Sequence, residues 1–228
     1  MPTPLESRAA LEAVTNQSVA EVIQLFGRLD GRPEVQRADL LDSPPGLIGY
    51  YSDGTAALAA DFYEEERELA RVRSRFRTEP IVLDRSEKIG RSIAWAAEPL
   101  VLGIAGASDL VESRLAEVIQ FEVAKPYRDT ITTNRRRDPD AVGWRRISNG
   151  GCRFCVMLAD RGAVFKAETA RFAAHPNCNC VAQPVFTTND TGEEASVIQY
   201  MASRRARSPK QRAELRDYLN TYYGDFPG

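Results

Sequence analysis

The sequence lacks several features that would assign it to a common class of protein. No apolar run approaches the roughly 18 residues that a membrane-spanning helix needs. No signal peptide accompanies the cysteines. We also find no phosphate-binding glycine loop, no G-x-S-x-G turn, no H-E-x-x-H motif and no internal repeat. These absences argue against a membrane protein, a nucleotide-dependent enzyme and the usual hydrolases, so we expect a soluble protein.

Cysteine and histidine are also scarce, and they are not scattered. The four cysteines and the single histidine all lie between Gly143 and Phe186. They form a C-x2-C pair followed later by H-x2-C-x-C, which is a spacing typical of zinc knuckles. Soft sulfur ligands with one imidazole favour tetrahedral Zn(II) over cations that prefer oxygen. The candidate ligands are Cys152, Cys155, His175, Cys178 and Cys180.

Five candidates compete for about four positions in a closed structural site. We favour Cys152, Cys155, His175 and Cys178, with Cys180 as the replacement for Cys178, because residues two apart in an extended segment face the same way. Three other interpretations stay open at this point. The cysteines can form two disulfides, remain as buried free thiols, or include a nucleophile that uses His175 as its base.

The same region resembles a known family. The matching residues are W-R-R-I, C-R-F-C-V-M-L-A-x-R-G-x-V-F and F-x-x-H-P-N-C-N-C, followed by P-V-F, and they lie between Tyr127 and Phe186. This ordered combination is similar to the minor head proteins of tailed bacteriophages related to the F protein of phage Mu, above all the version in phages of actinobacteria. Such proteins join the portal vertex in a few copies during head assembly.

The resemblance implies a stand-alone, non-enzymatic minor capsid protein with a structural Zn(II) site. The resemblance implies the portal protein as partner, with the major capsid protein or packaged DNA as further candidates. It implies no association with a membrane. The implied location is the virion, inside the capsid or at the portal vertex, after assembly in the host cytoplasm. The alternative is a zinc-dependent enzyme or nucleic-acid-binding module that acts during head morphogenesis.

The net charge of −2 hides local charge of both signs. Residues 53–68 carry six acidic side chains against Arg67, a local charge of −5. Residues 125–147 carry seven basic side chains against three acidic ones, and residues 201–217 carry six against two, so each segment is +4. Surfaces of this kind favour contact with a charged partner, although a solvated helix face is the simpler explanation. The candidate contact residues are Arg135, Arg136, Arg137, Arg204, Arg205 and Arg207.

Hydrophobic periodicity predicts a mainly α-helical fold with a small α+β module. We divide the chain into a helical docking region (1–138), a zinc-knuckle module (139–187) and a linker with C-terminal basic helices (188–228). Thr3 and Ser208 are predicted to start helices as capping boxes, and Pro126 to kink or divide a long helix. The expected helices span 4–30, a short stretch through Leu41, 53–77, 86–98, 108–136, 153–161, 196–204 and 208–224. The expected strands are 144–147, 181–186 and a short one at 164–165, the first two forming an antiparallel hairpin.

Overall fold

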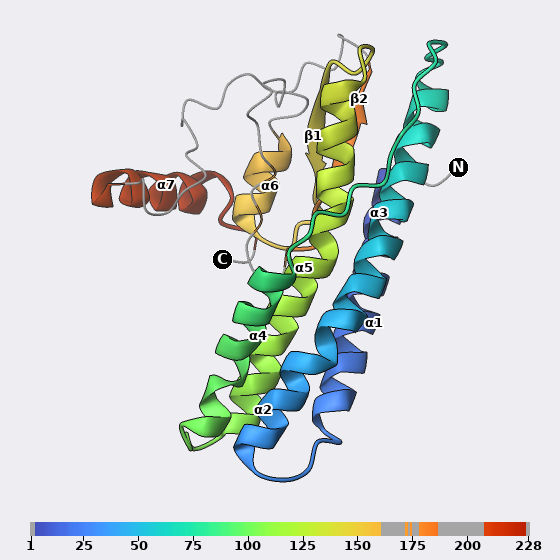
Figure 1. Cartoon of the computed structure of the whole chain (residues 1–228). Helices are drawn as coiled ribbons and strands as arrows, with labels where there is room; N and C mark the ends of the chain where they lie inside the picture. Colours follow the sequence, from blue (N-terminus) through green and yellow to red (C-terminus); the bar gives the residue numbers. More distant parts are fainter. Residues whose placement is uncertain (1–2, 161–171, 173, 175–177, 187–207, 227–228) are drawn as a thin grey trace.

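The computed structural model describes residues 3–160, 172, 174, 178–186 and 208–226. Within them, a bundle of long helices runs along most of the molecule (Figure 1). α5 is the central helix, because α1, α3 and α4 all pack against it. The bundle consists of α1 (Pro4–Phe26), α2 (Pro33–Asp42), α3 (Pro44–Leu69), α4 (Ser86–Val101) and α5 (Ala107–Arg137).

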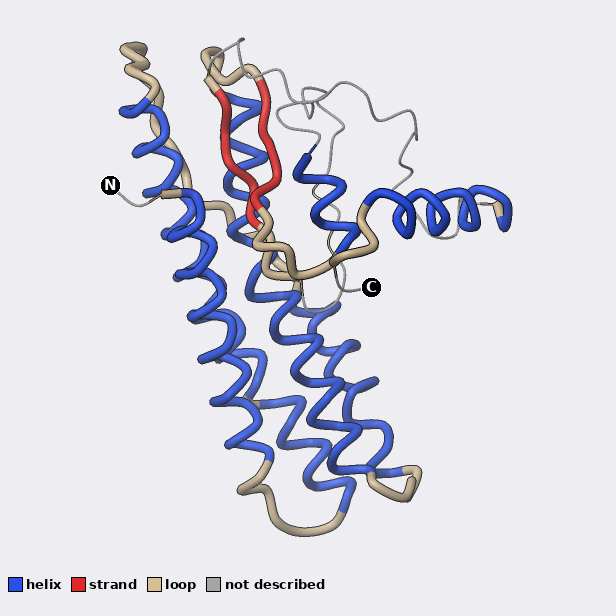
Figure 2. The backbone as a smooth tube through the Cα atoms, turned by 180° about the vertical axis from the view of Figure 1, so that it is seen from behind, coloured by secondary structure: helices blue, strands red, loops and turns tan. Residues whose placement is uncertain are grey.

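A small hairpin lies beside one end of α5 (Figure 2). It pairs β1 (Gly143–Ile147) with β2 (Val181–Val185), antiparallel, with Trp144 opposite Pro184. α6 (Arg153–Asp160) follows β1, and α7 (Pro209–Tyr222) packs on α6 and extends sideways from the bundle (Figure 1). The mainly helical fold with an antiparallel hairpin is therefore confirmed.

Both predicted capping boxes are present. Thr3 Oγ1 accepts from the backbone N–H of Glu6 at 3.2 Å, and the Glu6 carboxylate accepts from the backbone N–H of Thr3 at 2.6 Å. Ser208 and Gln211 make the same reciprocal pair before α7. Each box satisfies two backbone donors that a helix N-terminus otherwise leaves without a partner.

The prediction for the third helix was wrong in its bounds. We expected a helix over 53–77, but α3 begins at Pro44 and ends at Leu69. Proline is accommodated in a first helical turn, because the N–H it lacks has no partner there. At the other end, Arg71 adopts a left-handed conformation with φ +56°, which stops the helix.

Several smaller expectations also need correction. α1 ends at Phe26, a few residues earlier than predicted. α5 continues as one helix through Pro126, so this proline does not divide it. The predicted strand at 164–165 and helix at 196–204 lie outside the described residues.

Two hydrophobic clusters hold the helices together. The first lies between all five bundle helices, α1 to α5, and contains fully buried side chains such as Val22, Ile93 and Leu115. The second joins α1, α3 and α5 to both strands, so Trp144 and Val181 pack with Tyr127 of α5. The hairpin is thus part of the core rather than an appendage. None of the described helices is both long enough and apolar enough to span a lipid bilayer.

A buried ion pair closes the end of the bundle near the hairpin. The Arg67 guanidinium on α3 donates to the Asp138 carboxylate just after α5, and the hydroxyl of Tyr63 donates to the same carboxylate at 3.2 Å. Burial, and then the negative charge of Asp138, raise the pKa of Tyr63 above its ordinary value. Tyr63 therefore stays protonated and remains a donor at neutral pH.

Replacing Asp138 by alanine should lower the free energy of unfolding by about 3–5 kcal/mol, because the Arg67 charge then stays buried without its partner. Urea unfolding followed by circular dichroism measures this loss. Glu87→Ala is the control, since it breaks the exposed pair with Arg91 on α4 and should leave the unfolding midpoint nearly unchanged. Equal midpoints for both variants would contradict the importance of the buried pair.

Candidate metal centre

The hairpin brings together the two cysteine pairs that are separated in the sequence. Cys152 precedes α6 and Cys155 lies in its first turn, while Cys178 and Cys180 lead directly into β2. Because Ile147 at the end of β1 pairs with Val181 at the start of β2, the entry to α6 lies next to the Cys178–Cys180 segment. Strand pairing therefore builds the site.

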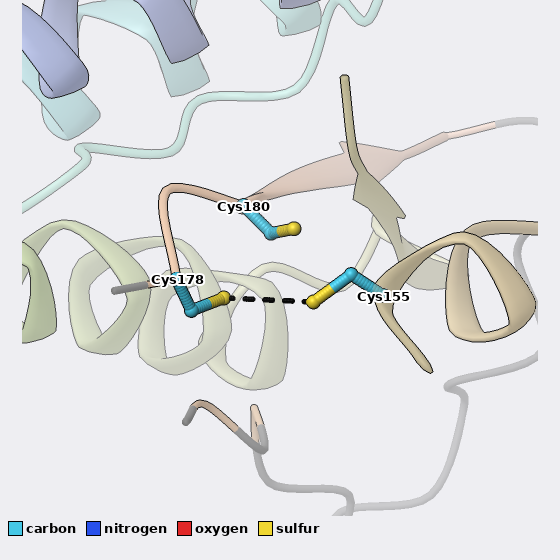
Figure 3. A group of neighbouring side chains, drawn as sticks. All are labelled: Cys155, Cys178 and Cys180. Carbon is cyan, nitrogen blue, oxygen red and sulfur yellow. Dashed lines mark hydrogen bonds between the residues drawn. The ribbon is translucent and has the colours of Figure 1, made fainter. Parts of the chain in front are cut away.

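Three cysteine sulfurs form a compact buried group (Figure 3). The Sγ atoms of Cys155, Cys178 and Cys180 all lie within 4.8 Å of one another, and these residues are 2%, 4% and 5% exposed. The Sγ atoms of Cys155 and Cys178 are 3.8 Å apart. Four sulfurs around zinc at about 2.3 Å, in a tetrahedron, are about 3.8 Å from one another. The three residues can therefore hold a metal ion.

The disulfide interpretation does not fit this geometry. All four cysteines are free. The 3.8 Å between the sulfurs of Cys155 and Cys178 is far longer than the bond of about 2.05 Å in a disulfide. Zinc, by contrast, needs free thiols that can lose their protons.

The other two candidate ligands are Cys152 and His175. Cys152 is half-buried and packs against the three-sulfur group, and its Sγ accepts from the backbone N–H of Cys155 at 3.3 Å. It lies outside the group of three sulfurs that are all within 4.8 Å of one another. His175 lies outside the described residues. We expected Cys180 to substitute for Cys178, but the structure places both sulfurs in the group.

Two buried arginines surround the sulfurs. Arg146 on β1 places Nη1 3.7 Å from the Sγ atoms of both Cys155 and Cys178. Arg128 on α5 donates to the carbonyl oxygens of Cys178 and Cys180, the latter at 3.1 Å. Both guanidinium groups also lie over the ring of Phe172, at 3.9 Å for Arg146 and 4.9 Å for Arg128. These contacts fix the direction in which the cysteine segment enters the site.

Sequence reasoning counted Arg128 and Arg146 only as part of a basic segment. The strand pattern did carry a signal for Arg146. Residues two apart in a strand share a face, so the burial of Trp144 in the core also buries Arg146. No comparable signal identified Arg128, because its position depends on how α5 meets the hairpin.

The arginines favour negatively charged sulfur. Hydrogen bonds from the thiols of Cys155 and Cys180 lower the pKa of Cys178, and the positive charges of Arg128 and Arg146 lower it further. In turn, burial lowers the pKa of Arg128, and the negative charge of Cys178 opposes that effect. Three thiolates around Zn(II) would give the centre a charge of about −1 with His175 as the fourth ligand and about −2 with Cys152, and the two guanidinium groups would offset this charge.

The three predicted contact arginines at the end of α5 differ in their exposure. Arg135 is half-buried and donates to the carbonyl of Val142 at 3.0 Å. Arg136 is exposed, and Arg137 is exposed and paired with Glu79 at 2.5 Å. Arg204, Arg205 and Arg207 lie outside the described residues.

The fold and the site together define a class: a mainly helical protein with a small antiparallel hairpin and a buried cysteine cluster that can hold a metal ion. The chain belongs to the VG15 protein family, a viral (phage) family, whose model matches residues 5–205. That range includes the bundle, the hairpin and every candidate metal ligand. Neither the curated proteins nor the solved structures contain a significant match to the chain.

We expect the purified protein to carry about one zinc ion per chain, measured by elemental analysis. Cys155→Ser, Cys178→Ser and Cys180→Ser should each release most of the ion, because all three sulfurs lie in the group. Comparing Cys152→Ser with His175→Ala then identifies the fourth ligand. Protein prepared without chelators that contains no metal would contradict the site.

Replacing Arg146 by glutamine should weaken zinc binding by about 10–100-fold, because a buried charge that stabilises the thiolates is lost. Competition with a chromophoric chelator measures the affinity. Arg145→Gln on the same strand is the matched control, since Arg145 is half-buried and bonds to Gln183 at 3.0 Å. An equal loss of zinc affinity in both variants would contradict this role of Arg146, because any positive charge on β1 would then have the same effect.

Proposed function

We propose that this protein is a non-enzymatic minor capsid protein of a tailed bacteriophage, attached at the portal vertex and acting in head assembly or in DNA packaging or ejection. The observation that carries the proposal is the match of residues 5–205 to a viral protein family. The finer assignment rests on the resemblance of residues 127–186 to the Mu F-like minor head proteins. On this proposal the protein is assembled in the host cytoplasm and then resides in the virion.

The burial of the sulfurs supports a structural role for the centre. A catalytic zinc keeps an open position for water or substrate, whereas a structural zinc is enclosed by four protein ligands. The sulfurs of the three-cysteine group belong to residues that are at most 5% exposed, and two arginines and Phe172 pack around them. We therefore assign Zn(II) a structural role, in which it would link α6 to the segment before β2.

An acidic surface on α3 is the best candidate for contact with the portal. Asp53, Asp61 and Glu68 are all exposed, and their spacings of eight and seven residues place them on one side of the helix. An exposed row of charges of one sign steers association with a surface of the opposite charge, and salt weakens that attraction.

In co-expression, the full chain should co-purify with the portal protein of its own phage, more strongly at low salt than at high salt. Asp53→Lys, Asp61→Lys and Glu68→Lys combined should reduce the recovered complex. The control combines Glu34→Lys, Asp39→Lys and Glu87→Lys, three exposed acidic residues on α2 and α4. It changes the net charge equally and should bind like the native chain.

Two results would count against the proposal. The first is a lack of association with the portal at any salt concentration, together with absence of the protein from purified heads. The second is zinc-dependent cleavage of capsid precursors or nucleic acid that disappears when Cys155 is replaced by serine, because this would indicate an enzyme.

A further inference from the structure

Four exposed arginines follow the end of α3. Arg71, Arg73, Arg75 and Arg77 alternate with Val72, Ser74 and Phe76, and all four arginines are exposed whereas Val72 and Phe76 are half-buried. The segment extends beyond α3 at the end of the bundle where the hairpin lies (Figure 1). We call these four residues the arginine tip.

The residues between the arginines anchor the segment to the bundle. The buried guanidinium of Arg67 donates to the carbonyl oxygen of Ser74 at 2.9 Å and to its hydroxyl at 3.1 Å. The Ser74 hydroxyl also donates to the carboxylate of Asp140. Phe76 packs against Tyr63 with ring centroids 6.1 Å apart, and Arg67 lies over the Phe76 ring at 5.2 Å.

The next residues of the segment are held as well. The Thr78 N–H donates to Glu64 at 2.9 Å, and Asn134 on α5 forms hydrogen bonds with both the N–H and the carbonyl of Glu79. The tip is thus flanked by fixed backbone on its C-terminal side. A segment that is held before binding loses less conformational entropy when a partner arrives.

The guanidinium groups of the tip are not taken up in direct ion pairs. Among the described residues, no carboxylate forms an ion pair with any of the four arginines. Several acidic side chains near the segment have other partners: Asp138 pairs with Arg67, Glu64 accepts from the Thr78 N–H, and Asp140 accepts from Ser74. Glu79 pairs with Arg137, although the charge of Arg77 also acts on it.

The chemistry of the tip fits phosphate. A guanidinium group presents a planar pair of donors that matches two phosphate oxygens, and arginine exceeds lysine wherever such bidentate contact matters. The tip contains four arginines and no lysine. A repeated row of cations also complements the regular row of charges along a nucleic-acid backbone.

We propose that the arginine tip binds the phosphate backbone of nucleic acid without reading its sequence. The one aromatic residue of the segment, Phe76, packs inward on Tyr63 and is not presented for base stacking. Backbone contacts alone position a protein on nucleic acid but carry no sequence information. This inference stands on the tip itself and does not depend on the portal assignment.

The test measures binding of the full chain to a fluorescent duplex of about 20 base pairs and to one of its single strands, over a range of salt. If all four arginines contact phosphate, affinity for the duplex should fall about 100-fold between roughly 50 and 200 mM salt. Replacing the four arginines by alanine should weaken binding by at least about tenfold at the lower salt and flatten the salt dependence. Whichever of the two ligands, duplex or single strand, binds more tightly identifies the form of nucleic acid that the tip prefers.

The matched control replaces Arg28, Arg32, Arg37 and Arg91, which lie between α1 and α2, on α2 and on α4. It lowers the net charge as much as the tip variant does and should keep the native salt dependence. Circular dichroism checks that both variants fold. Equal binding by the tip and control variants would overturn the proposal. Displacement of the DNA by polyglutamate, added at an equal concentration of negative charge, would also overturn the proposal. The tip would then recognise acidic protein surfaces.

Discussion

Two guanidinium groups are buried beside three cysteine sulfurs, and this arrangement constrains the rest of the hairpin end of the molecule. Arg128 and Arg146 are 3% and 2% exposed. Removing an ion from water costs several kcal/mol unless nearby groups compensate it. Here the compensation comes from the sulfurs 3.7 Å from Arg146, from the carbonyls of Cys178 and Cys180, and from the ring of Phe172. Thiolates in turn need cations, which the arginines and a bound divalent metal would both supply.

α5 connects this centre to the helical bundle. Its first half contributes Val111, Leu115 and Ile119 to the cluster shared with α1, α2, α3 and α4. Its second half contributes Tyr127 and Ile131 to the cluster shared with the strands, and Arg128 to the cysteine segment. Polar contacts add to this connection, because Asn179 bonds to Gln120 of α5 at 2.6 Å and to Glu12 of α1 at 3.2 Å, and Gln183 bonds to Glu66 of α3 at 2.8 Å. Order at the metal centre and packing of the bundle therefore depend on each other.

Local signals in the sequence predicted local structure well. The capping boxes at Thr3 and Ser208 needed only short-range chemistry, whereas the antiparallel pairing of the two strands, which are more than 30 residues apart, was predicted from their apolar patterns. The end of α3 was mispredicted because Val72 and Phe76 continue its apolar spacing, yet they face inward from a non-helical segment that Arg67 holds through Ser74. Spacing also located the cysteine cluster, but it could not rank Cys178 against Cys180. The buried arginines were missed because their roles depend on long-range contacts.

The chain is a mainly helical protein of a viral family, and three buried cysteines beside its hairpin can hold a metal ion. X-ray absorption at the zinc edge identifies the atoms that surround a bound zinc ion directly. We expect at least three sulfurs at about 2.3 Å from zinc. A shell of nitrogen and oxygen alone at about 2.0–2.2 Å would contradict it, because the ion would then lie outside the group of Cys155, Cys178 and Cys180.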